Sequence, residues 1–181
     1  MQLLLRDGLL TGTAVVVAAP GAEPGPFGSA VAARAGELGA AVEPLGVDPA
    51  GEERPFGGRA DLLVWDGAAA AAGGVRAALD GAWLAIRPVA AAAMIPEECG
   101  GGRIVLLAPS PGGVDAAGAR AGLENLARTL SVEWARFMVR PVAVLPGAAT
   151  SPAEVAELVA FLASPAGEYY SGCAFSLGEV P

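Results

Sequence analysis

The chain has 181 residues, 54% of them apolar and 17% charged, which suits one domain with a packed core and excludes a disordered polyelectrolyte. Its formal net charge of −8 disfavours nucleic acid as a partner, because an acidic surface repels phosphate. There is no histidine, and all 11 basic residues are arginine. Mechanisms that need an imidazole or an amine on this chain are therefore excluded, including Ser-His-Asp triads, histidine-ligated metals, Schiff bases and Walker lysines.

The cysteines and the apolar stretches bear on the compartment. Cys99 and Cys173 lie far apart without CxxC spacing, so we expect two reduced thiols and neither a zinc site nor a redox pair. Arg76, Asp80 and Arg87 interrupt the Ala-rich middle of the chain, so no uncharged stretch is long enough to span a membrane. We expect a soluble, cytoplasmic protein with no metal site and no membrane contact.

In the first half of the chain, predicted strands alternate with helices. Residues 13–19 are a run of β-branched and small apolar residues, which is typical of a buried strand. A turn rich in glycine and proline covers 20–28, and a helix follows over 29–38 and ends at Gly39. Further strands are predicted over 41–45 and 61–65. An Ala-rich helix is predicted from Val75 to Ile95, with a kink at Pro88.

The second half continues the alternation. A strand over 103–108 precedes a helix from Ala116 to Phe137, in which large apolar residues recur at three- and four-residue spacing. A strand over 141–145 precedes a helix that begins at Ser151, where a serine cap, a proline and a glutamate stand in the first turn. A last strand covers 172–177. Apolar strands alternating with helices predict a parallel sheet covered on both faces, in a single domain over residues 1–181.

Four segments of the second half carry a resemblance to a known family. They read GRIVLLAPS, AGLENLARTLSVEWAR, RPVAVLPG and EVAELVAFLASPAGEYYSGCAFSLG, and their order and spacing resemble those of short-chain dehydrogenases/reductases. The resemblance implies a Rossmann-like, doubly wound parallel sheet in three α/β/α layers. Only residues 46–60 separate the second strand from Asp61, too few for the helix, strand and helix that a complete member has there. We therefore expect a sheet with one shortened edge.

The resemblance also locates catalytic positions, and this chain departs from all of them. Members of the family usually carry a Tyr-x-x-x-Lys pair on the helix that corresponds to Ala116 to Phe137, with a serine and an asparagine nearby. Here the four positions fall on Ala116 for the tyrosine, Arg120 for the lysine, Ala108 and Pro109 (with Ser110 one place late) for the serine, and Ala78 for the asparagine. We expect no catalytic residue in this chain.

The cofactor loop is altered as well. The family pattern TGxxxGxG places backbone amides against a pyrophosphate at a helix N-terminus, and here Gly21, Gly25 and Gly28 remain as GxxxGxxG. Pro24 and Pro26 have no N–H to offer. A tight strand-to-helix turn is the plainer interpretation of this degenerate loop.

Other residues near the loop also differ from the family. Glu23 adds negative charge to a phosphate site, and Phe27 adds bulk where the backbone should approach closely. The acid that should bind the adenosine ribose falls near Gly46, with Asp48 two residues further on, and the family's NNAG reads Trp-Asp-Gly-Ala over 65–68. We expect no cofactor in this chain.

The retained segments suggest a role. In the family, two long helices form a four-helix bundle with a neighbouring subunit, and the last helix and strand form a second interface. The corresponding helices here, Val75 to Ile95 and Ala116 to Phe137, are rich in alanine, which permits close helix approach but also fits a general Ala-rich composition. The sequence therefore favours a catalytically silent subunit in a hetero-oligomer, such as a heterotetramer, with an active dehydrogenase paralogue that binds NAD or NADP. A bulky charged residue at Ala121 or Ala82 should break this complex, and residues 172–177 should form a secondary contact.

Two other functions stay open. One is a residual NAD(P)-dependent oxidoreductase that uses Arg120 and Ser110 or residues of a partner. The other is a binding module whose altered cleft holds a different ligand, such as an acyl-CoA or an acyl chain. A neighbouring reading frame that encodes a full-length dehydrogenase with an intact Tyr-x-x-x-Lys pair would favour the subunit hypothesis.

Overall fold

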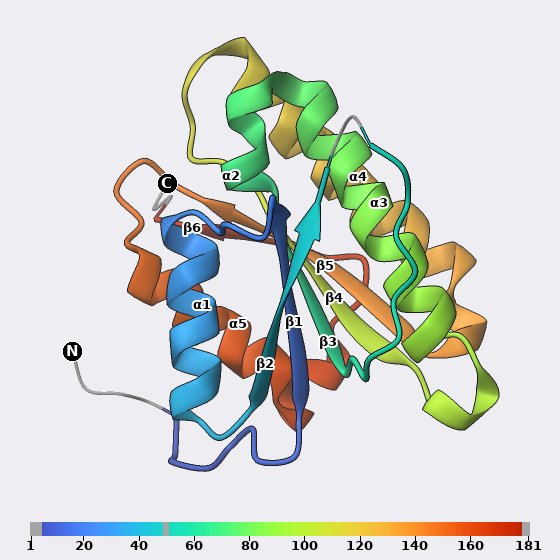
Figure 1. Cartoon of the computed structure of the whole chain (residues 1–181). Coiled ribbons are helices and arrows are strands. Elements are labelled where there is room, and N and C mark those ends of the chain that lie inside the picture. The colour runs from blue at the N-terminus through green and yellow to red at the C-terminus, as the bar shows by residue number, and fades with distance from the viewer. Residues whose placement is uncertain (1–4, 49–50, 179–181) are drawn as a thin grey trace.

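A computed structural model describes residues 5–48 and 51–178 of the chain. Six strands form one all-parallel sheet in the order β2-β1-β3-β4-β5-β6 (Figure 1). The chain runs outward from β1 to β2, crosses back over β1 to β3, and then adds strands in the opposite direction. This is the doubly wound order that the sequence predicts. The strands are β1 Ala14–Pro20, β2 Ala41–Val47, β3 Leu62–Asp66, β4 Gly102–Leu107, β5 Val139–Pro146 and β6 Ala174–Leu177.

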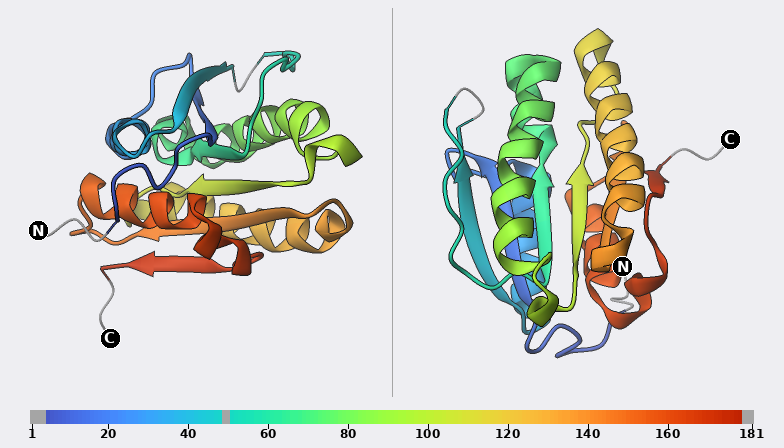
Figure 2. Two further views of the ribbon diagram at one scale, coloured as in Figure 1. Left: turned by 90° about the horizontal axis from the view of Figure 1, so that it is seen from below. Right: turned by 90° about the vertical axis from the view of Figure 1, so that its right-hand side faces the viewer.

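Helices cover both faces of the sheet, which confirms the predicted three layers. One layer holds α1 and α5, and the other holds α3 and α4, which run side by side (Figures 1 and 2). The α-helices are α1 Pro26–Glu37, α2 Gly67–Ala70, α3 Gly74–Ala93, α4 Gly113–Glu133 and α5 Pro152–Ala163. Short 3-10 turns lie at Ala71–Gly73, Glu97–Cys99, Ala135–Phe137 and Pro165–Tyr169. Within the described residues, none of these helices combines the length and apolarity that a membrane span needs.

The two cores follow from the alternation of side chains along the strands. Val16, Leu63 and Ile104 belong to the cluster that packs under α3 and α4. Their neighbours Val15 and Leu62 belong to the cluster under α1 and α5. Because successive strand residues point to opposite faces, a strand buried on both faces must be apolar throughout, as β3 is in its first four residues.

The shortened edge is confirmed. β2 is the outermost strand on its side of the sheet, and the described residues between β2 and β3 form neither helix nor strand. Pro44 lies within β2, a residue that sheets tolerate at edges because it donates no ladder hydrogen bond.

Several element boundaries differ from the sequence prediction. α4 begins earlier, at Gly113, and ends at Glu133; the last predicted turn is a separate 3-10 turn before Met138, which is left-handed at φ 59°. α1 begins at Pro26 because a proline suits the first helical turn. α3 continues through Pro88 to Ala93. The short helix α2 was not predicted; its N-cap is Asp66, whose carboxylate accepts a hydrogen bond from the N–H of Ala69.

Candidate cofactor cleft and outer helix face

The carboxyl ends of the strands are where open parallel sheets bind ligands. At this edge, an open cavity of about 600 Å³ lies between the ends of β1 and β2. The structure brings Gly21 of the altered glycine loop to the same cavity as Gly46, where the family's ribose acid would fall, and Asp48. Its lining residues are Pro20, Gly21, Ala22, Gly46, Val47, Asp48 and Arg54.

In the loop between β1 and α1, the first three backbone N–H groups form hydrogen bonds with carbonyl oxygens of the same chain. The N–H of Gly21 donates to the carbonyl oxygen of Val47 at 3.1 Å, that of Ala22 to Ala19 at 3.2 Å, and that of Glu23 to Pro20 at 3.1 Å. Gly21 and Ala22 are both left-handed, with φ 62° and 66°, which turns the loop back on itself. These three N–H groups therefore point at carbonyl oxygens of the chain.

The remaining glycines of the loop face a carboxylate. Asp66, at the end of β3, accepts hydrogen bonds on Oδ2 from the N–H of Gly25 at 2.8 Å and of Gly28 at 3.2 Å. The Asp66 side chain is completely buried, at 0% exposure. Sequence reasoning treated Asp66 only as part of an altered family motif and missed this role. The available signal was an acid at the end of an apolar strand, directly before Gly67, which is a typical N-cap position.

A nicotinamide dinucleotide does not fit these residues. A pyrophosphate needs N–H groups that point toward it at the start of α1. Here Pro24 and Pro26 have none, and the amides of Gly25 and Gly28 are bonded to the carboxylate of Asp66. Gly21, Gly25 and Gly28 thus lie at the expected place, but their N–H groups already form hydrogen bonds within the chain.

The positions that correspond to the catalytic pair carry no proton-transfer chemistry. Ala116 lies in the first turn of α4 and offers only a methyl group. One turn later, Nη1 of Arg120 donates to the carbonyl oxygen of Pro109 at 2.8 Å and to that of Pro146 at 2.6 Å. Arg120 therefore ties the loop after β4 to the end of β5, a structural role for its guanidinium. No group of three or more metal-ligating side chains occurs among the described residues.

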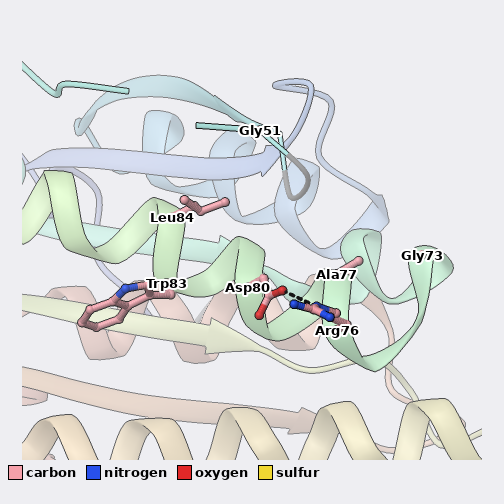
Figure 3. A pocket seen from close by; sticks show the side chains of 7 residues that line it. All are labelled: Gly51, Gly73, Arg76, Ala77, Asp80, Trp83 and Leu84. Carbon is pink, nitrogen blue, oxygen red and sulfur yellow. Dashed lines mark hydrogen bonds and ion pairs between the residues drawn. The ribbon is translucent and has the colours of Figure 1, made fainter. Parts of the chain in front are cut away.

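A second and larger cavity, of about 760 Å³, lies on the outer surface of α3 (Figure 3). Arg76 and Asp80 form an ion pair there, with Nε and Oδ2 2.8 Å apart. The hydrogen bond to Asp80 raises the pKa of the Arg76 guanidinium above its ordinary value. Trp83 and Leu84 complete this part of the wall, and Gly51 comes from the loop after β2. The wall combines apolar surface with a neutralised ion pair, which suits contact with another molecule better than catalysis.

Close packing between α3 and α4 explains two glycines. A Cβ atom at Gly118 would lie 2.9 Å from Cγ2 of Val75, and one at Gly122 would lie 2.7 Å from Cδ1 of Leu79. Beyond these contacts, Trp83 on α3 lies with its ring centroid 6.3 Å from that of Trp134. The glycines thus let two helices of the same chain approach each other.

The outer face of the two helices exposes apolar side chains. We define the α3/α4 face by Trp83, Val114, Ala121 and Val132, all of which are exposed; the α4 members recur at helical spacing. Val114 and Val132 are 88% and 80% exposed. Ala82, by contrast, is fully buried in the core of its own chain, so its expected place on the contact surface is wrong.

The comparisons with known proteins agree with the topology. The sequence matches no protein-family model and none of the curated proteins compared with it. A solved hydroxysteroid dehydrogenase from Escherichia coli aligns over 94% of this chain and 97% of its own, with TM-score 0.74 and 19% identity. A citronellol catabolism dehydrogenase from Pseudomonas aeruginosa aligns over 96% of each chain, with TM-score 0.72 and 25% identity. A protein assigned as a short-chain dehydrogenase/reductase from Burkholderia xenovorans aligns over 94% of this chain and 96% of its own, with TM-score 0.75 and 23% identity. The chain therefore has the fold of the short-chain dehydrogenases/reductases.

Proposed function

We propose that this chain is a catalytically silent subunit that assembles with, and stabilises, an active NAD(P)-dependent dehydrogenase paralogue. The observation that carries the proposal is the state of the cofactor loop. The amides of Gly25 and Gly28 are bonded to Asp66, although the sheet and the helices around the loop are those of a dehydrogenase fold. The chain keeps the scaffold of the fold without the groups that perform its chemistry.

The α3/α4 face supports the proposed assembly. It exposes large apolar side chains, and such patches on a soluble protein mark contact surfaces. A partner with the same fold would present its own two long helices to this face, and an obligate interface of that kind buries on the order of 2,000 Å² or more. NAD or NADP, and the Tyr-x-x-x-Lys pair, would then belong to the partner.

A secondary contact would run along β6. This strand pairs with β5 on one side only and lies at the edge of the sheet. An edge strand presents unpaired N–H and C=O groups to which another chain can add. The neighbouring segment exposes Tyr169, at 91%, beside the cluster in which Tyr170 packs against Phe161 and Phe175.

The experiment is co-expression with a full-length dehydrogenase encoded in an adjacent reading frame, followed by purification through a tag on one chain. We expect both chains to co-purify, with all turnover lost when the partner's tyrosine is replaced by phenylalanine. Ala121→Arg on the α3/α4 face should separate the chains. Ala33→Arg is the matched control, because Ala33 is an exposed alanine on α1, in the opposite layer. A monomer that ignores the dehydrogenase would overturn the proposal.

The two alternatives differ in what supports them. A residual oxidoreductase would need Arg120 at the reacting centre, and its guanidinium is bonded to two backbone carbonyls, one in the loop after β4 and one at the end of β5. A binding module for an acyl-CoA or acyl chain is supported by the cavity on α3, where Trp83 and Leu84 offer apolar surface near Arg76. Co-purification of the two chains separates the subunit from the module, which becomes the leading function if the chain remains alone.

A further inference from the structure

The junction between β1 and α1 supports an inference that can be tested without a partner chain. We propose that the carboxylate of Asp66 acts as an internal anion. It binds the amides at the start of α1 that a phosphate would bind, and it thereby prevents a dinucleotide from binding to this loop. The proposal deepens the silent-subunit function by giving a physical reason for the expected lack of cofactor.

The first line of support is the hydrogen bonding of both carboxylate oxygens. Oδ2 accepts from Gly25 and Gly28 at 2.8 and 3.2 Å, and Oδ1 accepts from Ala69 at 3.0 Å. Three backbone donors thus converge on one carboxylate with 0% exposure. A buried charge is tolerated only when its lone pairs are satisfied, and here they are satisfied by the amides at the starts of two helices.

The second line of support is that α1 has no local cap. Its N-cap is Gly25, which has no side chain to cap the helix, and its first turn holds no acidic residue. The N-terminus of a helix carries partial positive charge and unbonded N–H groups, which favour an anion. Asp66 supplies that anion from β3, 41 residues along the chain from Gly25.

The third line of support is the space around Gly28. A Cβ atom at Gly28 would lie 2.4 Å from Oδ2 of Asp66 and 2.8 Å from Cβ of Pro24. This glycine has an ordinary helical backbone, with no positive φ. Its missing side chain is therefore required by the approach of Asp66, so the retained glycine needs no phosphate ligand to explain it.

The consequence for a dinucleotide is electrostatic as well as steric. A pyrophosphate brought to the loop would meet the carboxylates of Asp66 and Glu23 in place of free amides. Like charges within a few ångströms repel strongly when they are shielded from water. The chain should therefore exclude phosphate ligands from this loop, whatever partner it binds.

The test measures thermal unfolding of the isolated chain and three variants in sodium chloride and in sodium formate at equal ionic strength. Formate supplies the carboxylate that Asp66→Ala removes. Asp66→Asn keeps the shape of the side chain but places an amide donor against one of the backbone donors. Asp61→Ala is the matched control, because the Asp61 carboxylate also accepts from a backbone N–H, that of Ala14 at 2.7 Å, but at the start of a strand.

We expect both Asp66 variants to unfold ~5–10 °C below the wild type. Formate should raise the midpoint of Asp66→Ala by ~3 °C over chloride and leave the wild type and Asp61→Ala unchanged. Pyrophosphate and NADH should not shift the wild-type midpoint. An Asp66→Asn variant as stable as the wild type, an equal formate effect on all variants, or stabilisation of the wild type by NADH would each overturn the proposal. None of these readouts involves the partner, so failure here and failure of the subunit function can be told apart.

Discussion

Replacing Gly28 by alanine is the most direct probe of how tightly the β1–α1 junction is built. The added methyl group would lie 2.4 Å from Oδ2 of Asp66, far inside van der Waals contact. Gly28 and Asp66 are both buried, so the carboxylate must move away. In moving, it weakens the hydrogen bonds from Gly25 and Gly28.

The magnitude follows from two contributions. Overpacking of one methyl group in a tight site costs ~1–3 kcal/mol, and the loss of a hydrogen bond to a charged group costs ~1.5–3 kcal/mol. The alanine regains ~1 kcal/mol of helix propensity. We therefore expect Gly28→Ala to lower the free energy of unfolding by ~3 kcal/mol, which corresponds to a midpoint ~6–12 °C lower for a domain of this size.

Gly36→Ala is the control, because it makes the same change in the same helix. Gly36 is exposed on α1, and a Cβ atom there would have nothing within 4 Å. This variant should gain ~0.5–1 kcal/mol from helix propensity alone. Equilibrium urea unfolding of both variants gives the comparison. If Gly28→Ala is as stable as Gly36→Ala, the carboxylate of Asp66 is not held at the start of α1 and our account of this loop is wrong.

Three further predictions concern the rest of the fold. Leu123→Ala should lower the free energy of unfolding by ~3 kcal/mol, measured in urea, because Leu123 lies on the buried side of α4 and is fully buried; a loss below ~1 kcal/mol would contradict this packing. Arg34→Met should destabilise by ~3 kcal/mol by stranding Glu157, its partner at 2.6 Å across α1 and α5, whereas adding Glu157→Met should recover most of the loss; additive losses would refute the coupling. The hydrogen bond from the backbone N–H of Ser151 lowers the pKa of the Glu154 carboxyl, so its contribution to stability is present above the unfolded pKa and disappears as the pH falls through the folded one. Glu154→Gln should therefore flatten the acid limb of the stability curve, and an unchanged acid limb would argue against the capping box.

Much of the fold could be predicted from the amino-acid sequence. The predicted strands match all six observed strands within a few residues. The four inner strands gave the clearest signal, because a strand buried on both faces must be apolar throughout. The start of α5 was predicted from Ser151, Pro152 and Glu154, since capping is a matter of adjacent residues. The shortened edge was predicted from the few residues between the second strand and Asp61, compared with what the resembling family has there. The lack of histidine and lysine in the sequence, and the alanine at position 116, were enough to exclude the family's usual proton-transfer groups.

The roles of the remaining residues depend on tertiary packing. Asp66 and Gly28 are 38 residues apart in the sequence, and only the placement of β3 beside β1 brings the carboxylate to the start of α1. Arg120 could be aligned with a catalytic lysine, but its bonds to the loop after β4 and to the end of β5 show a structural role. The alanines of α3 look alike in the sequence, yet Ala82 is buried in the core. Local patterns encode which segments are helix or strand, whereas strand order and helix rotation, which set the contacts, depend on the packing of the whole chain.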